Sequence, residues 1–106
     1  MPEQPSDDNQ TGSKRSIAVT APHAGSDLTA GSNVIINTET SDTNGSVVRV
    51  DFYVDGRSIG YDTKAPFDWF WFNVPDGKHV IKAVARDDGG NEYSSGSVSV
   101  NVNLKR

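Results

Sequence analysis

The sequence contains no cysteine and only two histidines, His23 and His79. The absence of cysteine excludes a thiol nucleophile, a disulfide scaffold and any zinc site with cysteine ligands. Leucine is also scarce, with two leucines against twelve valines. Because β-branched side chains pack well in strands and lose rotamer freedom in helices, this ratio favours a β-sheet protein.

The sequence also lacks a basic run and a long apolar stretch, and these two absences argue against nucleic acid and membrane as partners. The 106 residues carry 10 basic and 14 acidic side chains, a formal net charge of −4, and no basic run. We therefore expect no nucleic-acid-binding surface. No stretch approaches the roughly 18 to 20 consecutive apolar residues that a membrane-spanning helix needs, so we also expect no membrane insertion.

The first fifteen residues differ in composition from the rest of the chain. Residues 1–15 hold one apolar side chain, that of Met1, among proline and polar residues. Such a segment cannot bury enough surface to offset its ordering entropy, so we expect a disordered linker over residues 1–15 and one domain over residues 16–104. The start also lacks the apolar region of a signal peptide, which indicates a fragment of a longer polypeptide.

The remaining residues form short alternating runs separated by turn residues. Strands are expected over residues 16–20, 33–39, 47–55, 57–61, 67–72, 78–87 and 93–104. The dipeptides Asp55-Gly56 and Asp76-Gly77 are strong hairpin signals, and no window has helical periodicity. This pattern predicts an all-β protein, an immunoglobulin-like antiparallel β-sandwich of about seven strands in two sheets.

The alternation within each run predicts which side chains face the core. Over residues 47–55, the expected inward set is Val48, Val50, Phe52 and Val54, and on the return strand it is Ile59 and Tyr61. Over residues 78–87, the expected inward set is His79, Ile81, Ala83 and Ala85.

Several motifs resemble a known family. They are a polar turn at 42–45, the run VVRVDFYVDG at 47–56, Ala-Pro-Phe at 65–67, Trp71, the run DGKHVIKAVARD at 76–87, and Gly-Asn at 90–91. Over residues 17–102 this pattern resembles the bacterial Ig-like module of secreted, multi-domain polysaccharide-degrading enzymes such as cellulases and chitinases.

The resemblance implies a non-catalytic accessory or spacer module, outside the cell or at its surface. Its partners would be neighbouring domains of the same polypeptide, and the isolated domain would be a monomer. It also implies that Trp71 fills the space between the sheets, against the small Ala83, while His79 reaches back to the backbone of its corner.

The aromatic residues are concentrated in one strand. Five of the nine lie in residues 67–72, where alternation directs Phe70 and Phe72 outward. One interpretation is a platform that stacks on sugar rings, with Tyr53 and Trp69 as further contacts, which would make the chain a carbohydrate-binding module. The alternatives are contact with a neighbouring domain, or a bulge near Trp69 that turns one phenylalanine inward.

Four aspartates form a second candidate site. Strand counting brings the loops that hold Asp42, Asp62, Asp87 and Asp88 to one end of the sandwich, where they would suit Ca²⁺. The alternative is that these residues stand there because turns favour them, and no contiguous calcium-loop motif is present. We expect no other cofactor.

No catalytic residues are assigned. The sequence has no nucleophile-elbow motif, and a single sandwich of this size offers little depth for a carboxylate pair. We therefore expect a non-enzymatic domain within a parent that is a glycoside hydrolase. A repeat of a cell-surface adhesin is a further alternative. Strand parity predicts that the chain enters and leaves the domain at opposite ends.

Overall fold

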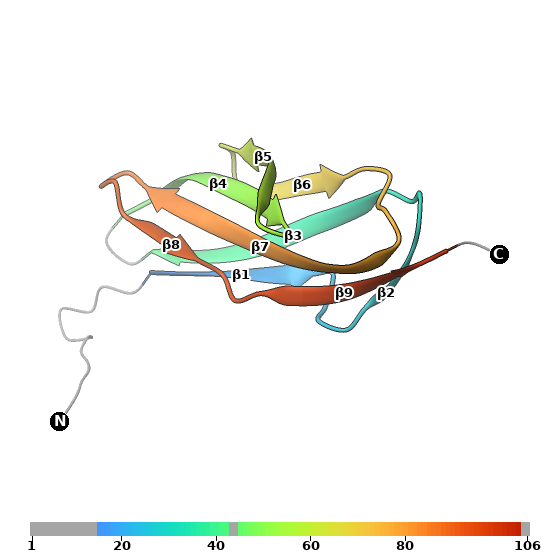
Figure 1. Ribbon diagram of the computed structural model, residues 1–106. Helices are drawn as coiled ribbons and strands as arrows, with labels where there is room; N and C mark the ends of the chain where they lie inside the picture. Colours follow the sequence, from blue (N-terminus) through green and yellow to red (C-terminus); the bar gives the residue numbers. More distant parts are fainter. Residues whose placement is uncertain (1–14, 43–44, 105–106) are drawn as a thin grey trace, which may run out of the picture.

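The computed structural model describes residues 15–42 and 45–104, which form two β-sheets packed face to face (Figure 1). The smaller sheet has the order β1-β3-β6, formed by β1 (Arg15–Ala21), β3 (Val34–Asp42) and β6 (Asp68–Trp71). The larger sheet has the order β2-β9-β7-β4-β5, with β8 also paired to β7. Its strands are β2 (Asp27–Thr29), β4 (Val47–Val54), β5 (Arg57–Asp62), β7 (Gly77–Asp87), β8 (Glu92–Ser94) and β9 (Val98–Asn103). The predicted fold class is confirmed.

The nine strands within the described residues correspond to seven predicted strands with two additions. The expected last strand is divided into β8 and β9, which pair with different parts of β7. Between them, Ser95 is buried and bonds to Ala83 twice, through its backbone N–H and through an Oγ that accepts the Ala83 N–H at 2.9 Å. The other addition is β2, which lies in a predicted loop and pairs in parallel with β9. The sandwich is therefore antiparallel except for one short pair.

The core lies between the sheets and follows the period of two. Its fully buried side chains include Ile36, Val50, Phe52, Ile81, Ala83 and Ala85. Trp71 is 7% exposed and belongs to the same cluster. Within the described residues there is no helix long and apolar enough to cross a membrane.

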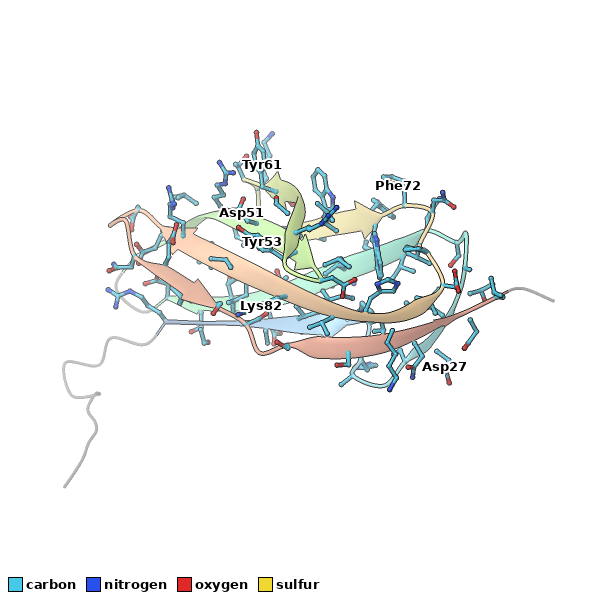
Figure 2. All side chains as sticks on the ribbon, in the orientation of Figure 1. Asp27, Asp51, Tyr53, Tyr61, Phe72 and Lys82 are labelled. Carbon is cyan, nitrogen blue, oxygen red and sulfur yellow. The ribbon has the colours of Figure 1, made fainter. Side chains whose placement is uncertain are left out.

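Two predicted orientations are wrong, and a bulge explains each. In β4 the pairing with β7 shifts between Val47 and Arg49, so that Val47 packs on the core and Val48 is 42% exposed. The extra residue reverses the alternation at that end of the strand. In β5, Gly60 pairs with Phe52 and Ser58 pairs with Tyr53, so Ile59 is the extra residue. Tyr61 therefore lies opposite Asp51 and faces outward (Figure 2).

The two ends of the domain lie apart. Strand β1 begins at one end of the sandwich and β9 finishes at the other, as strand parity predicted (Figure 1). The predicted linker lies outside the described residues except for Arg15, which belongs to β1 and bonds to Asp87.

Candidate functional site

Strand β6 has two aromatic faces at the edge of the smaller sheet. It pairs with β3 in regular register, with Phe70 opposite Ile35, and no bulge turns either phenylalanine inward. Phe70 is 52% exposed and Phe72, which follows the strand directly, is 64% exposed. The two rings stack, with centroids 5.8 Å apart and planes 26° apart. The structure thus places both phenylalanines on the surface, as alternation predicted.

Trp69 lies across the gap between the edges of the two sheets. Its Nε1 donates a hydrogen bond to the carbonyl of Ile59 at 3.1 Å, and its ring stacks on Phe52 at 6.3 Å. The ring also lies directly on Gly60, where an added Cβ would stand 2.2 Å from two ring carbons. A glycine within a strand marks a close approach of this kind, which was the one available sequence signal for this contact. The indole therefore has one fixed position between β5 and β6.

Two hollows meet at this edge and share Trp69, Phe70 and Phe72. One hollow of about 290 Å³ is completed by Asp62 and Asp68, and the other, of about 430 Å³, by Ile59 and Trp71. We call the five residues of the first hollow the aromatic groove: Asp62, Asp68, Trp69, Phe70 and Phe72. Figure 2 shows Phe72 where β6 ends. The groove combines exposed rings with carboxylates, the composition of a small-ligand site.

Asp62 organises the polar side of the groove. Its Oδ1 accepts the backbone N–H of Lys64 at 3.0 Å, and its Oδ2 accepts that of Asp68 at 3.1 Å. The same segment is held from the other side by Thr38, whose hydroxyl donates to the carbonyl of Phe67 at 2.6 Å. These bonds fix the backbone on which Phe70 and Phe72 stand.

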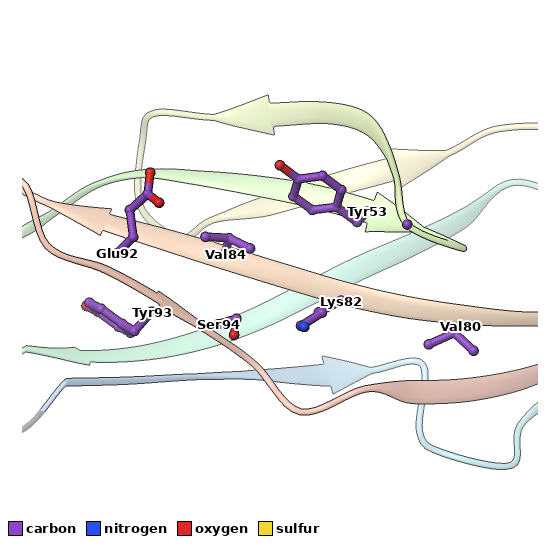
Figure 3. A pocket seen from close by; sticks show the side chains of 8 residues that line it. Tyr53, Val80, Lys82, Val84, Glu92, Tyr93 and Ser94 are labelled. Atoms are coloured by element: carbon purple, nitrogen blue, oxygen red, sulfur yellow. The ribbon is translucent and has the colours of Figure 1, made fainter.

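The remaining predicted contact, Tyr53, is not part of this groove. It lines a separate depression of about 450 Å³ on the larger sheet (Figure 3). Lys82, Val84 and Glu92 line the same depression. The structure thus brings together Trp69, Phe70 and Phe72, and it places Tyr53 elsewhere.

The four predicted metal ligands do not converge. Asp62 lies opposite Val50 of β4, whereas Asp87 lies opposite Val47, three positions further along the same strand. That separation is about 10 Å at the rise of a strand. Within residues 15–42 and 45–104, no group of three or more acidic or histidine side chains could hold a metal ion. The expected convergence is wrong because β5 ends before it reaches the loops of the other aspartates.

Asp87 and Asp42 nevertheless lie together, and both side chains are only 2% exposed. Asp87 accepts the backbone N–H groups of Gly89 and Asn91 and the Nε–H of Arg15, the last at 3.0 Å. Burial alone would raise the pKa of Asp87, but the hydrogen bonds from Asn91 and Arg15 hold it well below its ordinary value. Asp87 therefore stabilises the turn over residues 87–91.

Asp42 has an unusual environment in the same cluster. Its Oδ2 accepts the hydroxyl of Tyr93 at 3.1 Å, and burial together with this bond raises the pKa of Tyr93 to about 12. Its Oδ1 is buried and has no hydrogen-bond partner among the described residues. An ideal Cβ on Gly45 would stand 3.3 Å from this oxygen and 2.7 Å from Oδ1 of Asp88. Calcium binding here stays a prediction.

His79 belongs to a different group of contacts from these aspartates. Its Nδ1 bonds to Oδ2 of Asp55 at 2.6 Å, and its Nε2 lies 3.0 Å from the carbonyl of Pro75. Its ring meets Trp71 edge to face, with centroids 5.5 Å apart. The bond to Asp55 raises the pKa of His79, and the same bond lowers the pKa of Asp55. With both ring nitrogens facing oxygen acceptors, the doubly protonated ring fits this corner best.

Comparison with known families assigns the fold. Residues 16–83 match a family described as the bacterial Ig domain. The chain belongs to that family. A search of curated proteins finds no match for this Ig domain.

A solved structure with substantial sequence identity comes from Clostridium thermocellum. This Ig domain is similar to a fibronectin(III)-like module of CbhA, with 33% identity and a TM-score of 0.78. The match covers 86% of this chain and all of the module, so the two correspond as whole domains.

More distant structures share the fold alone. The endo-β-1,4-mannanase of Thermotoga petrophila is 12% identical with a TM-score of 0.69, over 92% of this chain and 22% of that enzyme. The superoxide reductase of Ignicoccus hospitalis is also 12% identical, with a TM-score of 0.66, over 92% of this chain and 87% of that protein. The sandwich therefore does not by itself indicate a function.

Proposed function

We propose that this Ig domain is a non-catalytic accessory module of a secreted bacterial enzyme that degrades polysaccharides, and that it separates neighbouring domains. The observation that carries the proposal is the whole-domain match, at 33% identity, to a fibronectin(III)-like module of CbhA. The motif at 47–56 together with that at 76–87 supports the same family of enzymes.

The architecture supports a spacer role. Because β1 begins at one end of the sandwich and β9 finishes at the other, flanking domains would be joined at opposite ends (Figure 1). The long strand β7 pairs with β4, β8 and β9, so one continuous element links most of the larger sheet. A folded sandwich of this kind fixes a separation that a flexible linker leaves variable.

The bonding of the buried carboxylates and of His79 supports a non-catalytic role. The buried carboxylates Asp42 and Asp87 are engaged by Tyr93 and Arg15, and His79 is engaged by Asp55 and backbone carbonyls. A general acid or base must instead reach a bound substrate. These groups stabilise turns and corners.

Domain replacement in the parent polypeptide tests the proposal. The Ig domain is exchanged for a glycine-serine linker of equal residue number, and hydrolysis of insoluble polysaccharide and of a short soluble oligosaccharide is measured. We expect slower hydrolysis of the insoluble substrate with unchanged turnover of the soluble one. Loss of both activities to the same extent, or of neither, would contradict a spacer role, as would a parent without a polysaccharide-degrading domain.

A further inference from the structure

We propose that the aromatic groove binds an uncharged chain of pyranose sugars, with Phe70 and Phe72 as the stacking platform. A spacer does not require such a site, so this inference goes beyond the accessory role and stands independently of it. It rests on the exposure of the two rings, the hollows beside them and the carboxylates at their margin.

The rings are displayed in the manner that stacking on a sugar requires. Phe70 is in β6 and Phe72 directly follows its last residue, Trp71, and the centroids of the two phenylalanine rings are 5.8 Å apart. Both are more than half exposed, and the hollows on either side leave ring surface open to a ligand. The C–H groups of a pyranose face make favourable contacts with an aromatic face, and successive residues of a chain can use both rings.

The groove is held in shape before any ligand arrives. Trp69 is fixed by its bond to Ile59 and by its contact with Gly60, and the Asp68 backbone is fixed by Asp62. At the far end of the platform, the backbone N–H of Asn73 donates to Oδ1 of Asn33 at 3.0 Å. A preformed site avoids part of the entropy cost of binding, which matters for a weak and shallow contact.

The carboxylates determine which occupant fits. Asp62 accepts two backbone N–H groups and keeps further lone pairs, and Asp68 has no side-chain hydrogen bond among the described residues. Sugar hydroxyls are hydrogen-bond donors that these oxygens can accept while the rings stack. An acidic polysaccharide would be repelled. An apolar protein surface would bury the carboxylates without partners, which is costly.

Titration of the 106-residue chain with cellohexaose, mannohexaose and N-acetyl-chitohexaose tests the inference, with two-dimensional NMR as the readout. We expect at least one of them to shift the backbone signals of Phe70 and Phe72 at millimolar concentration, with an affinity that does not depend on salt. A hexagalacturonate, which is acidic, is expected to produce no shift. If none of the three neutral probes binds, the inference is wrong.

Variants locate the site. We expect Phe70→Ala or Phe72→Ala each to weaken binding about tenfold, the equivalent of one good ring contact, and the double variant to abolish it. Phe72→Trp is expected to retain binding. Val48→Ala is the matched control, because Val48 is an exposed apolar residue of the other sheet. Equal binding by the double variant would contradict the placement.

Self-association provides the competing outcome. If the rings instead contact a second copy of the chain, light scattering will show a concentration-dependent dimer that Phe70→Ala/Phe72→Ala dissociates. That result without glycan-induced shifts would overturn the inference. Neither outcome bears on the spacer role, which depends on the parent polypeptide.

Discussion

The segment 67–72, which contains β6 and the residue on either side of it, carries the same class of residue in opposite environments on its two faces. On the inner face, Phe67 and Trp71 are 5% and 7% exposed, whereas on the outer face Phe70 and Phe72 are 52% and 64% exposed. Stabilisation by an aromatic side chain depends on the apolar area removed from water. The inner rings therefore support folding, and the outer rings contribute little to it. Folding and surface recognition can thus be separated on one strand by mutation.

The sharpest test of this difference compares Trp71→Ala with Phe72→Ala. Loss of a buried indole leaves a cavity and is expected to lower the free energy of unfolding by about 3–5 kcal/mol. Loss of the exposed Phe72 ring is expected to change it by about 0.5 kcal/mol or less. Urea denaturation measures both values. If Trp71→Ala does not fold, Trp71→Phe provides a milder loss at the same site. Similar costs for Trp71→Phe and Phe72→Ala would contradict the comparison.

Gly60→Ala is expected to affect both faces at once. A Cβ at position 60 would overlap the Trp69 ring, and the backbone there has a φ of 153°. Displacement of the indole is expected to cost about 1–3 kcal/mol, as for overpacked cores, and to reshape the groove. Thermal denaturation and Trp fluorescence report the two effects. Gly56→Ala is the control, because its turn has a positive φ but no atom near an added Cβ. A normal Trp69 signal in Gly60→Ala would show that the glycine contact is unimportant.

The sequence predicted the parts of the fold that depend on alternation and turn chemistry. The period of two identified Val50, Phe52, Ile81 and Ala83 as core residues, all of which are fully buried. The Asp55-Gly56 turn also occurs as expected, with positive φ at both residues. Local sequence determines these features, so they could be predicted without knowledge of the partner strands.

Features that depend on pairing between strands could not be predicted in this way. The bulges that turn Val48 and Tyr61 outward arise from the register of β4 with β7 and β5. The separation of Asp62 from Asp87 has the same origin. In the groove, alternation predicted the exposure of Phe70 and Phe72. It could not predict the contact of Trp69 with Gly60, because these residues belong to two different sheets. Gly60 indicates that some group comes close to its strand, but alternation does not identify Trp69 as that group.

A change in pH is expected to act on the inner face of β6 through the pair of His79 with Asp55, because the His79 ring packs on Trp71. The pair with Asp55 raises the pKa of His79 above its ordinary 6.5, so its stabilisation is complete below that pH and is lost as pH rises through the folded-state value. The pair also lowers the pKa of Asp55 below 3.8, so its contribution is present above that pH and is lost as pH falls through the lowered value.

The melting temperature should therefore contain a contribution from this pair that is largest between about pH 4 and 6.5. His79→Gln is expected to melt at a lower temperature in that window and to lose the decline above it. Because the Asp55 side chain is 46% exposed, solvent screens the pair and the effect is smaller than that of Gly60→Ala. Parallel pH profiles for the two proteins would show that the pair does not contribute.

Asp42→Asn tests a site that neither face of β6 touches, and its expected effect is the smallest. The substitution removes one of two adjacent buried carboxylates and places an amide where Oδ1 lacks a partner. Because removal of one of two adjacent buried negative charges relieves their mutual repulsion, we expect a gain of about 0.5–1 kcal/mol in the presence of EDTA. Calcium should raise the melting temperature of the unmodified chain only, if the predicted ion binds at Asp42, because the variant lacks the charged ligand. A lower stability of Asp42→Asn in EDTA would show that the buried carboxylate is itself required, most directly as the acceptor for Tyr93 and a neighbour of Arg15.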